Sequence, residues 1–163
     1  MDTARATIVE HDDGEILGDE NSSLRLLTDA SDTDGAVSSL EVRLAPGADG
    51  AAPHFHTASA ELFYVIEGEL QVLVDDRIVT ASAGSSIVVP KRMVHAFGAT
   101  PGAATRLLIA LMPGTERFGY FRLLDRIRSG DATYEELLAS QDTYDNHFVD
   151  APKWWAERAA IRR

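Results

Sequence analysis

The strongest constraint on the fold is a series of short, strand-like segments between residues 39 and 113. In "SLEVRLAPG", Leu40, Val42 and Leu44 alternate with charged residues, which is the period-two pattern of a strand with one buried face. Further segments rich in Val, Ile and Leu follow, separated by Gly, Pro or Asp-Asp: "ELFYVIEG", "ELQVLVDD", "RIVTASAG", "SSIVVPK", "MVHAFGAT" and "TRLLIALMPG". Short strands at this spacing predict an all-β domain of antiparallel strands, either a sandwich or a barrel.

The character of the sequence changes after residue 113, where helical patterns begin. Apolar residues recur at helical spacing over residues 116–130, and Gly130 is a suitable stop. Thr133 and Glu136 have the spacing of a capping box, and Pro152 is suited to the first turn of a last helix. The sequence therefore predicts a helical C-terminal tail.

Together these patterns predict one domain with three parts. A chain of 163 residues has the usual length of a single domain. We expect an N-terminal arm with early strands over residues 1–38, the β-barrel core over 39–113, and the helical tail over 114–163, packed on the outside of the barrel.

Composition excludes several classes of function. The formal net charge of -11 argues against a nucleic-acid partner, which requires clustered Lys and Arg. The sequence contains no cysteine, so histidine and carboxylate are the strong metal ligands that remain. We find neither an apolar run long enough to cross a membrane nor a secretory signal, so we expect no membrane partner and a cytoplasmic location.

One segment, "PHFHTASAELFYVIEG", carries polar residues where a strand should be apolar. His54 and His56 are two residues apart, so on a strand both imidazoles lie on one face and can reach the same ion. Glu61 follows after a short stretch of small residues, and His95 lies in a later strand-like segment. Three imidazoles and one carboxylate would form a site for one divalent transition metal ion, namely Fe, Ni, Mn, Co or Zn.

Each of these residues has a simpler explanation when taken alone. A single histidine among apolar residues is more often a hydrogen-bonded core residue than a ligand, and Glu61 could cap a turn or pair with a surface arginine. His11 and His147 lie outside the pattern in polar surroundings, and we expect both at the surface.

The combined spacing resembles the two sequence motifs of the cupins. "HFHTASAELFYVIEG" supplies the two histidines, the glutamate and Gly68 of the first motif, and "GSSIVVPKRMVHAFGA" supplies Gly84, Pro90 and the histidine of the second. Three positions depart from the pattern, none of them a ligand: Ala48 and Arg92 replace glycines, and Ala99 replaces an asparagine. If position 92 requires a positive φ, Arg there costs about 1 kcal/mol.

The resemblance implies a fold and a site, and it suggests an activity. It implies a jelly-roll barrel of two antiparallel sheets with His54, His56, Glu61 and His95 as metal ligands. The chain looks most like small bacterial single-domain cupins related to quercetin 2,3-dioxygenase, partly on "MPGTERFGYFRLL" and "YDNHFVD". That likeness implies a dioxygenase acting with O2 on a small enolisable aromatic or polyketide-like substrate, with Glu61 as catalytic base.

Two alternatives remain open at the level of sequence, because cupins perform many reactions. The first is a metal-dependent isomerase, cyclase or lyase that does not use O2. The second is a non-catalytic cupin that binds a small molecule.

Apolar residues of the predicted strands could line a substrate pocket in the barrel. The candidates are Phe63, Val65, Val72, Val88 and Phe97. Plain barrel packing explains the same residues equally well, since strand register cannot be read to one residue. Apolar strands on the outside of the barrel, together with Trp154 and Trp155, favour a homodimer.

Overall fold

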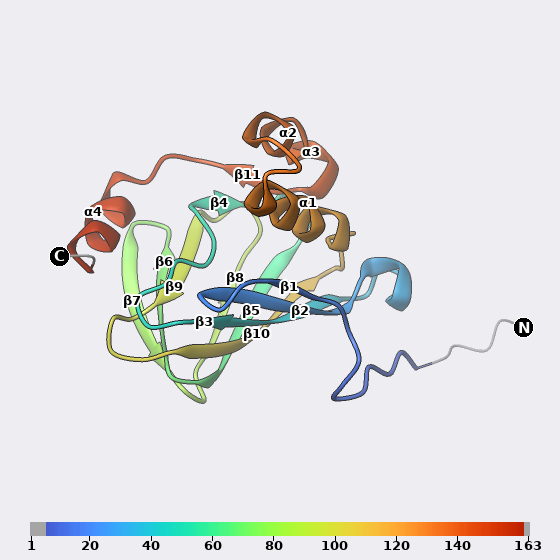
Figure 1. The fold of residues 1–163 in the computed structure, drawn as a ribbon, viewed down its shortest axis with the longest axis horizontal. Helices are drawn as coiled ribbons and strands as arrows, with labels where there is room; N and C mark the ends of the chain where they lie inside the picture. Colours follow the sequence, from blue (N-terminus) through green and yellow to red (C-terminus); the bar gives the residue numbers. More distant parts are fainter. Residues whose placement is uncertain (1–5, 162–163) are drawn as a thin grey trace, which may run out of the picture.

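Two antiparallel sheets form the body of the protein in a computed structural model that describes residues 6–161 (Figure 1). The start of the predicted N-terminal arm, residues 1–5, lies outside the described residues. The first sheet has six strands in the order β1-β2-β3-β10-β5-β8. Their bounds are Ile16–Gly18 (β1), Ser22–Thr28 (β2), Ser38–Leu44 (β3), Thr105–Met112 (β10), Ala60–Glu67 (β5) and Ser86–Val89 (β8).

The second sheet has five strands in the order β11-β4-β9-β6-β7. Their bounds are His147–Phe148 (β11), His54–Phe55 (β4), His95–Ala99 (β9), Glu69–Val74 (β6) and Arg77–Ser82 (β7). Every predicted strand segment is found. The strand expected around His54 and His56 is only the two-residue β4. Strand β11 is an addition, since a segment this short leaves no periodic signal.

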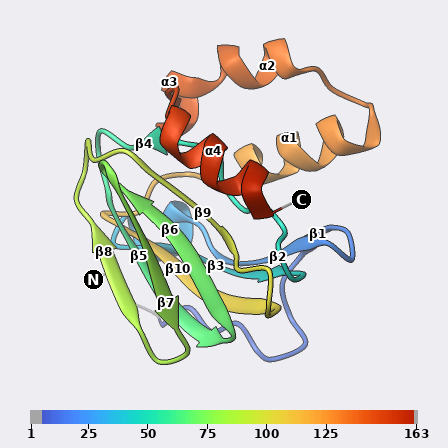
Figure 2. The same ribbon diagram turned by 90° about the vertical axis from the view of Figure 1, so that its left-hand side faces the viewer.

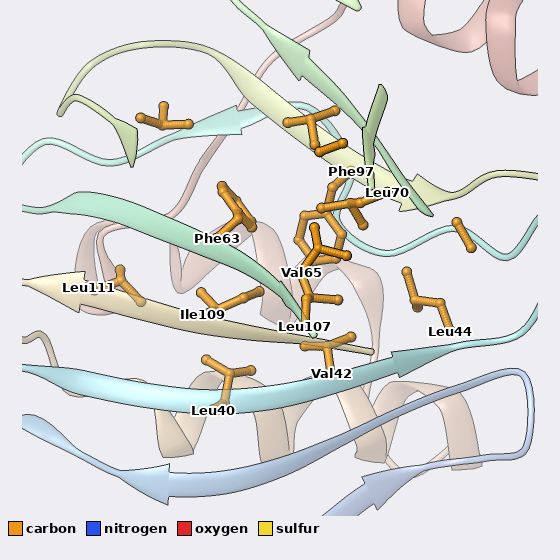
Figure 3. Packing of buried hydrophobic residues seen from close by; sticks show 14 residues of the cluster. Leu40, Val42, Leu44, Phe63, Val65, Leu70, Phe97, Leu107, Ile109 and Leu111 are labelled. Atoms are coloured by element: carbon orange, nitrogen blue, oxygen red, sulfur yellow. The ribbon is translucent and has the colours of Figure 1, made fainter. Parts of the chain in front are cut away.

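The core lies between the sheets because their strands alternate apolar and polar residues. Phe63 and Val65 on β5 and Leu107 on β10 are among the buried side chains that meet there (Figure 3). Glu61 has the same parity as Phe63 and Val65, so the pleat of β5 turns its carboxylate inward as well. The all-β jelly-roll fold is confirmed, although the described strands form two separate sheets and no closed cylinder.

The helices follow the last long strand. They are α1 (Phe118–Ser129), α2 (Tyr134–Ala139), α3 (Gln141–Tyr144) and α4 (Pro152–Ile161), with one 3-10 turn, η1 (Ala30–Thr33), between β2 and β3. Gly130 ends α1 in the left-handed conformation, and Thr133 and Glu136 form the predicted capping box of α2. No described helix is long and apolar enough to cross a membrane.

The tail packs in two different ways (Figures 1 and 2). Helix α4 lies on the outer face of the five-stranded sheet, where Trp154 packs against Leu73 and Ala96. Strand β11 instead joins the edge of that sheet beside β4, and α1 contacts β1 of the other sheet. Only α4 therefore packs as a simple outer layer, whereas α1 and β11 extend the structure around the predicted metal site.

Candidate metal centre

The two sheets bring together the four residues predicted as metal ligands. His54 on β4 is paired across the strands with His95 on β9, and His56 follows β4 directly. Glu61 comes from β5 of the opposite sheet. One ligand atom from each of the four residues lies within 4.8 Å of the others, and all four residues are buried.

The hydrogen bonds of the three Nδ1 atoms determine the tautomer of each imidazole, and therefore whether its Nε2 can bind a metal. The Nδ1 atoms of His54, His56 and His95 lie 2.7, 2.6 and 2.9 Å from backbone carbonyl oxygens. A carbonyl only accepts, so each Nδ1 must carry a proton and donate it. In the neutral ring, Nε2 then presents its lone pair to the centre, which is the tautomer that binds a metal.

The carboxylate of Glu61 faces these inward nitrogens. Its Oε2 lies 2.6 Å from Nε2 of His95 and 3.1 Å from Nε2 of His56. Burial alone would raise the pKa of Glu61, but hydrogen bonds from these two histidines hold that pKa well below its usual range. Glu61 is therefore ionised.

The histidines respond differently to the same burial. Burial lowers the pKa of His95, but the hydrogen bond and charge of Glu61 outweigh it, and the pKa of His95 is raised. Burial and the two neighbouring imidazoles leave the pKa of His54 well below its usual range. Without a metal, a proton on Nε2 of His95 bridges to Glu61, so a metal ion and this proton compete for one atom.

The donor set fits a divalent transition metal. Three neutral imidazole nitrogens and one carboxylate oxygen suit Fe, Mn, Co, Ni or Zn, and four protein ligands leave positions open in an octahedron. The group could therefore hold one metal ion and still expose it to a small molecule.

Asp145, which the sequence analysis did not single out, supports the loop that carries His56. Its carboxylate accepts hydrogen bonds from the backbone N–H of Thr57 and of Ala58 at 2.8 Å each. Its own carbonyl oxygen is the acceptor for Nδ1 of His56. The Asp145 pKa is lowered because these hydrogen bonds outweigh partial burial. Only the quoted segment "YDNHFVD" indicated that this part of the tail matters.

The turn before β9 contains the strained position anticipated from the sequence. Arg92 has φ 68°, in the left-handed region that favours glycine. Its backbone N–H donates to the carbonyl oxygen of His56 at 2.6 Å. The strained turn thus connects the segments that carry two of the three histidines.

A cavity of about 370 Å³ opens at this centre. His54 and Glu61 form part of its wall, and Phe97 contributes an aromatic surface. The opposite wall belongs largely to α1, from Arg117, the residue before its first turn, through Tyr120, Phe121 and Leu124. These positions have the i, i+3, i+4, i+7 spacing of one helix face.

The structure separates the five residues predicted to line a pocket. Phe97 lies on the cavity wall, while Phe63, Val65 and Val72 are buried in the core between the sheets. The prediction for Val88 is wrong: this residue is 57% exposed, and the neighbouring Val89 is buried instead. The reason is register, because shifting a strand by one residue exchanges its two faces.

The remaining histidines lie outside the cluster. The side chain of His11 is 95% exposed and pairs with Asp12. His147 on β11 is partly buried, stacks on Phe55 and lies 3.2 Å from Asp145. His147 is therefore less exposed than we expected.

Comparison with known proteins agrees with this fold and site. Residues 40–111 match the family described as Cupin domain. The match contains all four residues of the cluster, and the fold around them is the cupin jelly roll. No curated protein sequence matches the chain significantly.

Several solved structures share the fold at low sequence identity. An RmlC-like cupin from Shewanella frigidimarina is 22% identical over 70% of this chain and 96% of its own, with a TM-score of 0.57. The polyketide cyclase RemF from Streptomyces resistomycificus is 22% identical over 67% and 80%, with a TM-score of 0.56. The Streptomyces nucleoside dehydratase Pac13 is 17% identical over 68% and 83%, with a TM-score of 0.53.

Proposed function

We propose that this protein is a metal-dependent enzyme that acts on a small enolisable molecule in the cavity beside His54 and Glu61. The observation that carries the proposal is the arrangement of the four side chains. Each histidine donates Nδ1–H to a backbone carbonyl, Nε2 of His56 and of His95 faces the Glu61 carboxylate, and one ligand atom of His54 lies within 4.8 Å of the others. A buried ionised glutamate among three oriented imidazoles at the wall of a cavity is suited to chemistry at a bound cation.

The residues of the chain divide the work between holding and proton transfer. His54, His56 and His95 would hold the ion, which when bound would supply Lewis acidity that lowers the pKa of a substrate hydroxyl. Glu61 is both part of the ligand set and part of the cavity wall, so its carboxylate can accept the hydroxyl proton. The apolar wall, including Phe97 and Phe121, keeps water from the reacting atoms.

For the reaction, we propose a quercetinase-like dioxygenase that cleaves or oxidises an aromatic or polyketide-like substrate with O2. Support comes from the cupin motifs and from the mostly apolar cavity. The alternative is an O2-independent isomerase, cyclase or lyase, and it is supported by the names of two proteins of similar fold, a polyketide cyclase and a nucleoside dehydratase. Turnover that continues unchanged under strict anaerobiosis would reject the dioxygenase.

The first experiment is metal analysis of protein prepared with and without oxygen, followed by reconstitution with Fe, Ni, Mn, Co and Zn. We expect about one equivalent in the wild type and in His11→Ala, which removes an exposed histidine, but little in His95→Ala. Glu61→Gln should retain metal better than turnover if the carboxylate accepts the proton. Equal metal content in His95→Ala and the wild type would contradict the assignment, and a wild type that takes up none of the ions would favour a non-catalytic binding protein.

We also propose a homodimer formed through the outer face of the six-stranded sheet. Tyr64 (42%), Val88 (57%) and Met112 (41%) are exposed on β5, β8 and β10, adjacent strands of that sheet. Light scattering should give about twice 17.7 kDa for the wild type and the monomer mass for Val88→Glu. A monomeric wild type would reject this interface.

A further inference from the structure

The cavity contains a buried positive charge that the proposed chemistry does not use. Arg117 is 4% exposed and lies on the cavity wall opposite the metal ligands of the sheets. Burying a guanidinium is costly unless a carboxylate and hydrogen-bond acceptors compensate it. The partners of Arg117 therefore indicate whether it serves the fold alone.

The guanidinium of Arg117 has no hydrogen bond or ion pair with a carboxylate among the described residues. Nη1 donates to the carbonyl oxygen of Tyr144 at 2.8 Å, and Nη2 donates to Oδ1 of Asn146 at 3.2 Å. The nearby carboxylate of Asp29 is instead engaged by the backbone N–H groups of Arg117 and Phe118 at the start of α1. Burial lowers the pKa of Arg117, and the charges of Glu61, Asp145 and Asp29 offset only part of this effect. The guanidinium carbon also lies 4.8 Å from the ring centroid of Tyr120 and 5.6 Å from that of Phe121.

Two buried N–H donors at this point have no acceptor in the described part of the chain. They are Nε of Arg117 and Nδ2 of Asn146, which is 2% exposed. The two side chains are hydrogen-bonded to each other and both line the cavity. Two buried donors without an acceptor, next to a positive charge, favour a ligand group that only accepts hydrogen bonds and carries negative charge. A carboxylate has both properties.

The remaining walls fit an organic anion. Tyr120 lines the cavity next to Arg117, and burial raises the pKa of Tyr120 to about 12, so its hydroxyl stays protonated and able to donate. Phe97, Phe121 and Phe148 supply an aromatic lining between the polar ends. The charged residues at the outer part, Asp125 and Arg128, pair with each other at 2.8 Å.

We infer that the cavity takes a carboxylate-bearing, enolisable substrate, with the carboxylate against Arg117 and Asn146 and the enolisable end toward Glu61 and His54. The choice of reacting end rests on the proposed function, whereas the carboxylate site rests on Arg117 and Asn146 alone. The planar guanidinium, with its fixed fork of donors, selects a carboxylate over a neutral group of the same shape.

The test compares phenylpyruvate with its neutral methyl ester by calorimetry, under anaerobic conditions, on protein reconstituted with metal. The wild type should bind the acid about tenfold or more tightly than the ester, because a charge-assisted hydrogen bond is lost with the ester. Arg117→Met should remove that preference, and Asn146→Leu should reduce it. Arg122→Met, which removes an exposed arginine of α1 that does not line the cavity, should leave the preference unchanged.

Melting curves verify that each variant is folded, and Arg117→Lys provides a second variant that keeps the charge but loses the fork. Equal affinity of the wild type for acid and ester, or a preference that survives in Arg117→Met, would overturn the inference. Repeating the comparison on chelator-treated protein separates the two proposals. A preference that depends on Arg117 without metal would support the carboxylate site even if no metal is taken up, and a metal-loaded protein without the preference would leave only the proposed function standing.

Discussion

Two buried arginines, Arg158 on the outer face of the five-stranded sheet and Arg117 at the cavity, differ in how completely their side chains are hydrogen-bonded. Arg158 on α4 is 2% exposed, and each of its guanidinium nitrogens has a partner: Nε pairs with Asp49 at 2.8 Å, while Nη1 and Nη2 reach Gln71 and the carbonyl oxygens of residues 47, 48 and 99. Arg117 is almost equally buried, yet it has two acceptors and an open Nε. A fully partnered arginine is a structural anchor, and a partly partnered one beside a cavity indicates a place for a ligand.

The sequence around each arginine fits this difference. Gly98 on β9 faces Arg158, and a Cβ atom there would lie 2.7 Å from Nη2, so glycine makes room for the anchor. Around the other arginine, the space that packing leaves unfilled is the cavity itself. The arginine that anchors the fold and the proposed ligand site thus lie on opposite sides of the five-stranded sheet.

The largest expected effect is on the anchor. Arg158→Met should lower the free energy of unfolding by about 3–5 kcal/mol, because it leaves Asp49 and several buried carbonyl groups without this donor. Arg117→Met should cost less than half as much, since it also removes a buried charge that is only partly compensated. Urea denaturation measures both, with Arg122→Met as the control for an exposed arginine, expected to change stability by about 1 kcal/mol or less. Equal losses at positions 117 and 158 would break the comparison.

The next effect concerns the support of the metal site from the tail. Asp145→Ala should weaken metal binding about 10- to 100-fold, because the loop that carries His56 loses the carboxylate that orders it. Asp145→Asn should recover part of the loss. Chelator competition measures the affinity, and Asp142→Ala, at an exposed position of the same segment, is the matched control. If Asp145→Ala binds metal like the wild type, the tail has no part in the centre.

A smaller effect is a pH dependence, which we expect for metal binding at His95 and not for the stabilisation by Arg158. The raised pKa of His95 means that its proton stabilises the metal-free fold below the unfolded pKa of 6.5, and this stabilisation is lost as the pH rises through the folded value. Because metal displaces that proton, metal affinity should fall about tenfold per pH unit below the folded pKa.

The control for the pH prediction is the anchor. The destabilisation caused by Arg158→Met should be the same at about pH 6 and about pH 8, because the hydrogen-bond partners of Arg158 are a carboxylate, an amide and backbone carbonyl groups, and include no histidine. Isothermal titration with metal at several pH values gives the first slope, and denaturation of the variant gives the second. A metal affinity that is flat across this range would contradict the bridging proton.

The smallest expected effect comes from the strained backbone of Arg92, in the turn before β9. Arg92→Gly should stabilise the protein by about 0.5–1 kcal/mol, since glycine adopts φ 68° without the Cβ penalty, less the entropy that glycine loses on folding. Thermal denaturation detects this change. Gly130, which ends α1 at φ 85°, offers the reverse control, because Gly130→Arg should destabilise. A loss of stability in Arg92→Gly would mean that the turn is not strained.

The group of three histidines and one glutamate could be predicted from the sequence, because the spacing that indicates it is local. Alternation places His54 and His56 on one face and Glu61 on the same face as Phe63, and these rules require no knowledge of distant residues. The error at Val88 comes from the same rule, since one residue of register decides whether Val88 or Val89 faces the core. Core strands and capped helices were predictable for the same local reasons.

The other cavity wall could not be predicted, because it depends on how the tail returns to the sheets. Arg117 and Asn146 are 29 residues apart in the sequence, and an arginine before an amphipathic helix is ordinarily a surface residue. Asp145 supports His56 from 89 residues away. No periodicity marks such partners. They become visible only when β11 is seen beside β4.

The pairing of β11 with β4 has a consequence for how the activity of this chain can change. In the proposed function, the sheets supply the metal ligands, and residues 117–148 supply much of the cavity wall beside them. Exchange of that one segment between proteins of this fold should therefore alter which compound is accepted. The metal site should survive the exchange only where the replacement keeps the contacts of Asp145 with His56 and its loop. In such an exchange the jelly roll would keep the proposed metal ligands, and residues 117–148 would determine the specificity for the substrate.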